Sequence, residues 1–166
     1  MSDTTCDVAI LMGSKSDLAT MKPAADVLKE LGLRVAVRVL SAHRTPEQTA
    51  AFVREATLTG TKVFICGAGG AAHLAGSVAA HTTRPVIGIP ISSGSLQGMD
   101  ALLSTAMMPP GIPVATVAIG GAENAGLLAA QIVAVSDPAL SQRVAAEREA
   151  RLRKVLEADA EVSAKF

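Results

Sequence analysis

The sequence has no Trp or Tyr and only three Phe among its 166 residues. Charged residues make up 18% of the chain, and 15 Lys and Arg balance 15 Asp and Glu, so the formal net charge is zero. Nucleic-acid binding needs a basic footprint and usually aromatic rings on which bases stack. Disorder needs low hydrophobicity together with a high net charge. The composition therefore argues against a nucleic-acid-binding protein and against a disordered chain.

Cysteine and uninterrupted apolar segments are also scarce. Cys6 and Cys66 are too few for a disulfide framework, and Cys66 ends an apolar run, which is typical of a buried thiol in a reducing compartment. The longest charge-free stretch, Ala101–Ala122, contains three prolines and three glycines, which disfavours a transmembrane helix. The first residues lack the basic and apolar regions of a signal peptide. We therefore expect a cytoplasmic protein without membrane contact.

Short β-branched runs alternate with longer runs rich in Ala and Leu along the chain. The short runs predict buried strands over Val8–Met12, Arg34–Leu40, Val63–Cys66, Pro85–Ile89 and Val114–Ile119. The longer runs predict helices over Leu18–Leu31, Pro46 to about Gly60, Ala71–His81, Met99–Met107, Glu123–Val135 and Leu140–Leu156. Thr45 and Gln48 are expected to form a capping box at the start of the second helix.

Alternating strands and helices form a parallel sheet that is covered on both faces, since each crossover places a helix on one face. Right-handed crossovers predict an α/β fold, a three-layer doubly wound sandwich with a five-stranded parallel sheet. We expect the flavodoxin-like strand order 2-1-3-4-5. Residues 1–166 are expected to form one domain, with a core over about 7–137 and a C-terminal helix over about 138–157.

Gly, Ser and His gather immediately after the first four predicted strands. Ligands of open α/β sheets bind outside the carboxyl ends of the strands, which is where these loops lie. The loops are Gly13–Asp17, Ser41–Thr45, Gly67–His73 and Pro90–Gly94. We therefore expect the binding site at this edge of the sheet.

The first and third of these loops have the composition of anion-binding turns. Ser14, Ser16 and a helix N-terminus can donate hydrogen bonds to an anion. An equally supported alternative is that a serine caps the helix and Asp17 faces its dipole. The third loop matches a G-x-G-x-x-A dinucleotide fingerprint, but no Asp or Glu lies between Ala56 and Met99 to bind a ribose. A small anion therefore fits this loop better than a dinucleotide.

His43 is the residue best suited to acid–base chemistry. The ordinary pKa of histidine, about 6.5, lies beside physiological pH, and Arg44 can clamp a phosphate or carboxylate next to it. The alternative is an ordinary surface histidine. His73 is equally compatible with ligand contact and with a helix surface, whereas His81 suits the end of a helix. Without metal-binding spacings, a serine-nucleophile elbow or a P-loop, the residues indicate metal-free acid–base chemistry on a small phosphorylated metabolite.

Three long motifs resemble the PurE family, and the likeness runs in order along nearly the whole chain. These motifs are Met12–Asp17, Ser41–Pro46 and Gly67–Leu74, supported by shorter matches at Met108-Pro109, Gly111–Val114 and Asn124–Ala130. The resemblance implies a flavodoxin-like fold and an isomerase, the N5-carboxyaminoimidazole ribonucleotide mutase of purine biosynthesis. It also implies a homo-octamer with shared active sites and a reaction that needs no metal, cofactor or ATP.

The resemblance also implies a role for each matching residue. His43 matches the catalytic acid–base of the family, Ser14 and Ser16 lie in the loop near the phosphate, and Asp17 matches the residue on the ribose hydroxyls. Ser41 and Arg44 match phosphate contacts. The loop around the migrating carboxylate is matched by Gly69, Gly70, Ala71 and His73.

Two other activities remain open at this point. A second branch of the family carboxylates aminoimidazole ribonucleotide directly with carbon dioxide, and it typically has Lys at the position of Arg44 and a non-glycine loop at 69–71. The sequence follows the mutase pattern at both places but departs from the family at Ala75, Ser92–Ser95 and Gly120–Glu123. The non-enzymatic alternative is a phosphate- or nucleotide-binding module, which would give His43 no task.

One long span lacks positive charge. No Lys or Arg occurs in the 58 residues from Pro85 to Gln142, which is unusually apolar for a free surface. Large apolar patches usually mark interfaces. We therefore expect part of this span and the final helix to be buried between subunits.

Overall fold

A five-stranded parallel sheet forms the centre of the protein. The computed structural model describes residues 5–166. Its strands are β1 (Val8–Met12), β2 (Val35–Val39), β3 (Val63–Gly69), β4 (Val86–Ile91) and β5 (Ala115–Thr116). The strands lie in the order β2-β1-β3-β4-β5, and all neighbouring pairs are parallel. This confirms the predicted flavodoxin-like order.

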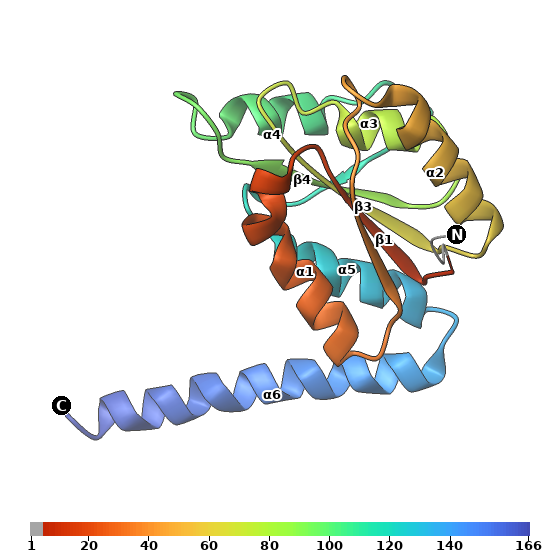
Figure 1. Ribbon diagram of the computed structural model, residues 1–166. Coiled ribbons are helices and arrows are strands. Elements are labelled where there is room, and N and C mark those ends of the chain that lie inside the picture. Colours follow the sequence, from red (N-terminus) through yellow and green to blue (C-terminus); the bar gives the residue numbers. More distant parts are fainter. Residues whose placement is uncertain (1–4) are drawn as a thin grey trace.

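Helices cover both faces of the sheet, as expected for a doubly wound fold (Figure 1). Helices α1 (Leu18–Glu30) and α5 (Ala122–Ala134) lie on one face. Helices α2 (Pro46–Leu58), α3 (Leu74–Ala79) and α4 (Met99–Ala106) lie on the other. A single 3-10 turn, η1 (Lys15–Asp17), precedes α1, and the long α6 (Pro138–Ser163) follows α5.

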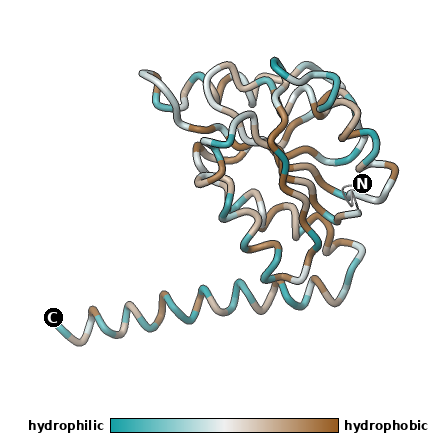
Figure 2. The backbone as a smooth tube through the Cα atoms, in the orientation of Figure 1, coloured by the Kyte–Doolittle hydropathy of each residue, from teal (hydrophilic) through white to brown (hydrophobic). Residues whose placement is uncertain are grey.

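The strands are apolar on both sides because both sheet faces are covered. Side chains of Ile10, Ile65 and Ile89 pack with α1 and α5, whereas those of Leu11 and Phe64 pack with α2 and α3. All five residues of β1 are buried. Hydrophobic residues therefore concentrate along the central strands, as Figure 2 shows. This double burial explains why the strands read as continuous apolar runs in the sequence.

Strand and helix ends differ from the prediction where loops and tertiary contacts set them. β3 continues to Gly69, because Gly67–Gly69 pair with Ile89–Ile91 of β4. α3 is consequently shorter than Ala71–His81 and begins only at Leu74. β5 has two residues rather than six, since Pro113 precedes it and Gly120, with its left-handed backbone, follows closely.

The capping box predicted for Thr45 and Gln48 is wrong. The Thr45 side chain makes no capping bond to α2. Its hydroxyl instead donates to the Ser41 carbonyl oxygen (3.1 Å) and accepts from the Ser41 amide (2.8 Å). Thr45 therefore closes the turn between β2 and α2, which carries His43 and Arg44.

The C-terminal helix α6 leaves the body of the protein (Figure 1). Leu140 is fully buried against the core, Arg143 donates to the Leu31 carbonyl oxygen (2.8 Å), and Arg151 pairs with Glu123 and Glu147. Every residue from 151 onward is exposed. The helix runs beyond the predicted end near residue 157, because no Gly or Pro interrupts it before Ser163. No helix over residues 5–166 is long and apolar enough to cross a membrane.

Gly126 allows α5 to lie directly against α1. A Cβ atom at this position would lie 2.5 Å from Cγ1 of Val27 and 2.9 Å from the carbonyl oxygen of Ala24. We expect Gly126→Ala to lower the free energy of unfolding by about 1–3 kcal/mol, because the two helices must separate. The same change in the middle of an exposed helix would raise the free energy of unfolding by about 1 kcal/mol. Urea unfolding measures the difference.

Gln131→Ala in the same helix is the matched control for this prediction. Gln131 is only half-buried, so its truncation is expected to change stability by less than about 0.5 kcal/mol. A Gly126→Ala variant as stable as the unchanged protein would contradict this prediction, because it would show that α1 and α5 can separate without loss of stability.

Candidate active site

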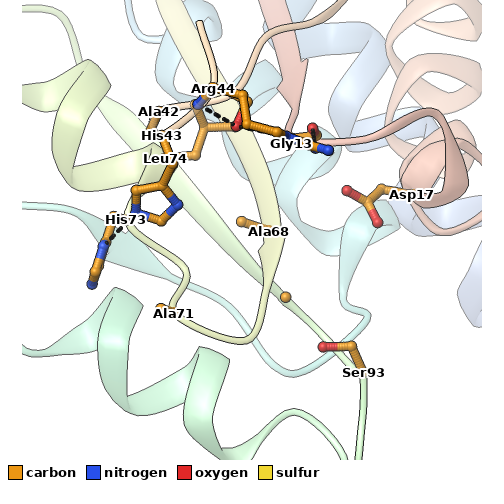
Figure 3. Close-up of a pocket in the computed structure, with 12 residues that line it drawn as sticks. Gly13, Asp17, Ala42, His43, Arg44, Ala68, Ala71, His73, Leu74 and Ser93 are labelled. Carbon is orange, nitrogen blue, oxygen red and sulfur yellow. Dashed lines mark hydrogen bonds between the residues drawn. The ribbon is translucent and has the colours of Figure 1, made fainter. Parts of the chain in front are cut away.

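A cavity of about 360 Å³ opens at the carboxyl ends of the central strands (Figure 3). A smaller hollow of about 250 Å³ adjoins it and shares Gly13, Ser41 and Arg44 with it. Seven of the ten site residues predicted from the sequence line the larger cavity: Asp17, Ser41, His43, Arg44, Gly69, Ala71 and His73. Ser14 lines the smaller hollow, whereas Ser16 and Gly70 line neither. The loops expected to meet therefore do meet at this sheet edge.

The loop after β1 is held by its own side chains. The Ser14 hydroxyl accepts from the Ser16 amide (3.3 Å), and the Asp17 carboxylate accepts from the Ser14 amide (3.1 Å), which completes a capping box. The Ser16 hydroxyl also donates to the Ser14 hydroxyl (2.8 Å). Ser14 thus caps the 3-10 turn η1, whereas Asp17 at the start of α1 makes no side-chain capping bond to that helix. Asp17 still lines the cavity, so capping and ligand contact are compatible roles for this residue.

Arg44 connects the loops after β1 and β2. Its Nη2 atom donates to the Gly13 carbonyl oxygen (2.6 Å), and its amide donates to the Ser41 hydroxyl (3.2 Å). Arg44 lines both hollows and is exposed. A planar, permanently charged guanidinium in this position is suited to bind an anion such as a phosphate.

His43 and His73 meet across the cavity although 30 residues separate them. Nε2 of His43 lies 2.8 Å from Nδ1 of His73, and the rings meet edge to face at 84° with centroids 4.9 Å apart. One of these nitrogens must carry the proton and the other must accept it. One proton therefore lies between the two rings at the cavity wall (Figure 3).

The end of β3 and the loop that follows it require glycine for two separate reasons. A Cβ atom on Gly69 would lie 2.6 Å from the Ser93 hydroxyl oxygen and 3.1 Å from the Ile91 carbonyl oxygen. Gly70 has a φ of +60°, in the left-handed region that favours glycine. The backbone consequently passes close to β4 at Gly69, which forms part of the cavity wall without a side chain.

Sequence reasoning missed several residues that line the cavity. Ala42, Ala68 and Leu74 contribute apolar surface, and their types carry no chemical signal in the sequence. Ser93 also lines the cavity, and its place in the loop after β4 was a signal that could have identified that loop, though not this serine rather than Ser92. The cavity therefore has a fourth wall, from the loop after β4.

Other titratable groups lie away from this chemistry. Nδ1 of His81 is 2.7 Å from the Ser77 carbonyl oxygen, which fits the structural role predicted for this helix end. Cys66 is buried as expected, and its burial raises the pKa of the thiol. Between residues 5 and 166, no three His, Cys, Asp or Glu side chains are grouped so that they could hold a metal ion.

The chain is similar to known proteins over most of its length. The sequence model of the AIR carboxylase family matches residues 7–154. An N5-carboxyaminoimidazole ribonucleotide mutase of Haemophilus influenzae is 53% identical over 155 residues, covering 92% of this chain and 94% of the relative. The mutase of Bacillus subtilis is 53% identical over 152 residues, covering 90% and 94%.

A solved structure gives the same result for the fold. The crystal structure of Treponema denticola PurE aligns with a TM-score of 0.84 and 35% identity, covering 93% of this chain and 96% of that one. The sheet order, the loops at its carboxyl edge and these matches agree with one another. The chain therefore belongs to the AIR carboxylase family, the PurE family that its motifs resemble.

Proposed function

We propose that this protein is an N5-carboxyaminoimidazole ribonucleotide mutase of purine biosynthesis. It converts its substrate to 4-carboxy-5-aminoimidazole ribonucleotide by moving a carboxyl group from the exocyclic nitrogen to the neighbouring ring carbon. The observation that carries the proposal is the position of His43, which contacts His73 and lines the same cavity as Gly69. The curated relatives with this activity are about half identical in sequence.

The reaction needs one proton delivered to the carbamate nitrogen and one proton removed from the ring carbon, and a single histidine can perform both transfers. His43 as imidazolium donates its proton to the carbamate nitrogen, the N–C bond breaks, its electron pair stays on nitrogen, and carbon dioxide departs. The ring carbon of the resulting enamine-like amine then attacks the trapped carbon dioxide and forms a C–C bond. Neutral His43 finally removes the ring proton and regains its starting state.

The remaining residues are proposed to bind and orient the ribonucleotide. The phosphate is held by Arg44 and Ser41, which line the shared rim of the two hollows. Ser14 lines the smaller hollow beside them, and Ser16 donates a hydrogen bond to Ser14. Asp17 accepts hydrogen bonds from the ribose hydroxyls. The loop around the carboxylate consists of Gly69, Gly70, Ala71 and His73, and its close packing against β4 favours retention of the gas.

One assay separates this activity from its two alternatives. Each ribonucleotide, the carbamate and the free amine, is supplied with and without bicarbonate, and the carboxylated product is followed. We expect product from the carbamate alone. Product only from the amine with carbon dioxide would instead identify a direct carboxylase, and no product in any arm would identify a binding module.

We further propose that the protein is a cytoplasmic homo-octamer whose subunits share active sites. Exposed apolar side chains support this assembly: Met99 and Leu103 lie one turn apart on α4, Met107 follows its last residue, and Leu152, Val155 and Leu156 lie on the projecting part of α6. Such patches are characteristic of interfaces. Light scattering at micromolar concentration is expected to give the mass of eight chains, and a stable monomer would contradict the proposal.

A further inference from the structure

Ser93 presents an unused hydroxyl to the cavity. It lies in the loop after β4, and its side chain points toward the interior of the cavity, on the side away from His43 (Figure 3). Within residues 5–166 its hydroxyl makes no hydrogen bond, whereas the cavity hydroxyl of Ser41 is already bonded to Arg44. A polar group in that state is available to a ligand.

The surrounding backbone fixes Ser93 against the loop after β3. Ile91, which lies two residues before Ser93, pairs with Gly69 of β3. A Cβ atom on Gly69 would lie 2.6 Å from the Ser93 hydroxyl oxygen. The loop beyond Ser93 turns through left-handed residues at Gly94 (φ +61°), Gln97 (φ +49°) and Gly98 (φ +93°). A left-handed non-glycine residue such as Gln97 persists only where its surroundings impose that conformation. The hydroxyl therefore has a defined place beside the glycine loop.

We infer that Ser93 binds the migrating carboxyl group and helps to retain it between bond cleavage and recapture. This inference rests on the proposed function, which places the carboxylate at the loop that Ser93 touches. The Ser93 hydroxyl donates a hydrogen bond to a carboxylate oxygen from the side of the loop after β4. As carbon dioxide forms, the hydroxyl stays directed at the oxygen and keeps the molecule beside the ring carbon.

A neutral donor suits this position for an electrostatic reason. A cation would stabilise the negatively charged carboxylate far more than neutral carbon dioxide, and it would therefore oppose the departure of carbon dioxide. A hydroxyl carries no net charge, so it stabilises the carboxylate over carbon dioxide less strongly than a cation would. The cavity keeps its cation, Arg44, on the rim shared with the smaller hollow.

The test compares Ser93→Ala with Ser92→Ala, since Ser92 is the adjacent exposed serine and does not line the cavity. Starting from the carbamate ribonucleotide, two rates are measured: formation of the carboxylated product, and enzyme-dependent release of the free amine with carbon dioxide. We expect Ser93→Ala to slow product formation about 3–10-fold, the range for loss of one hydrogen bond, and to raise the ratio of released amine to product several-fold. Ser93→Thr restores the ratio because it keeps a hydroxyl.

The outcomes distinguish the two proposals. If the unchanged protein forms no carboxylated product, the proposed function fails and this inference falls with it. If the unchanged protein is active and Ser93→Ala releases no more amine than Ser92→Ala does, only the role of Ser93 is overturned. Substituting an exposed serine by alanine changes stability by less than about 0.5 kcal/mol as a rule, so the variant is expected to fold.

Discussion

His43→Asn is expected to lower kcat by at least ~10²-fold while the protein still folds and binds its ribonucleotide. The asparagine amide is close to the imidazole in size and polarity, so the contact with His73 can be replaced in part. It cannot carry a proton to the carbamate nitrogen or remove one from the ring carbon near neutral pH. Steady-state product formation measures kcat, and calorimetric titration with the carboxylated ribonucleotide measures binding.

His81→Asn is the matched control, because it makes the same chemical change at a histidine outside the cavity. The His81 ring contacts the Ser77 carbonyl oxygen, and an asparagine there leaves His43, His73 and Arg44 in place. We expect this variant to keep kcat within about twofold of the unchanged protein. Near-normal turnover by His43→Asn would remove His43 from the mechanism and would leave the cavity without an assigned acid–base.

The order of strands and helices was predictable from the sequence because burial on both sheet faces leaves a local pattern. Val8–Met12 is apolar at every position, since each side chain packs against one helical layer or the other. The ends of elements were less predictable because contacts with distant residues decide them. β3 extends through Gly67–Gly69 only because β4 lies beside it, and no local propensity favours glycine in a strand.

The site was predictable as a set of loops but not as a geometry. Parallel strands place the loops of His43 and His73 on one edge, yet the 2.8 Å contact between these rings depends on the packed fold. Thr45 shows the same limit. Its place at the start of a helix predicts a capping residue, but in the structure the Thr45 hydroxyl closes the preceding turn. Ser93 lay in a loop already identified by its composition, but nothing local distinguished its hydroxyl from that of Ser92.

Arg44→Ala is expected to raise KM by about 10–100-fold while kcat changes only a few-fold. A hydrogen bond to a charged group contributes about 1.5–3 kcal/mol, and 1.4 kcal/mol corresponds to a factor of ten. Arg44 lies on the rim shared by both hollows, where we place the phosphate rather than the reacting atoms. The interaction is therefore equal in ground state and transition state, and its loss appears in KM rather than kcat.

Arg44→Lys and Arg84→Ala complete this test. Lysine keeps the positive charge but not the planar fork, so it is expected to recover only part of the lost affinity. Arg84 is exposed and does not line the cavity, so its removal changes the net charge equally and is expected to leave KM within about twofold. If both alanine variants raised KM alike, long-range attraction by the whole protein would explain the effect. If only Arg44→Ala raises KM, and a higher salt concentration reduces that increase only partly, the phosphate lies at this guanidinium. Short contacts at a cavity rim are screened by salt less than distant charges are.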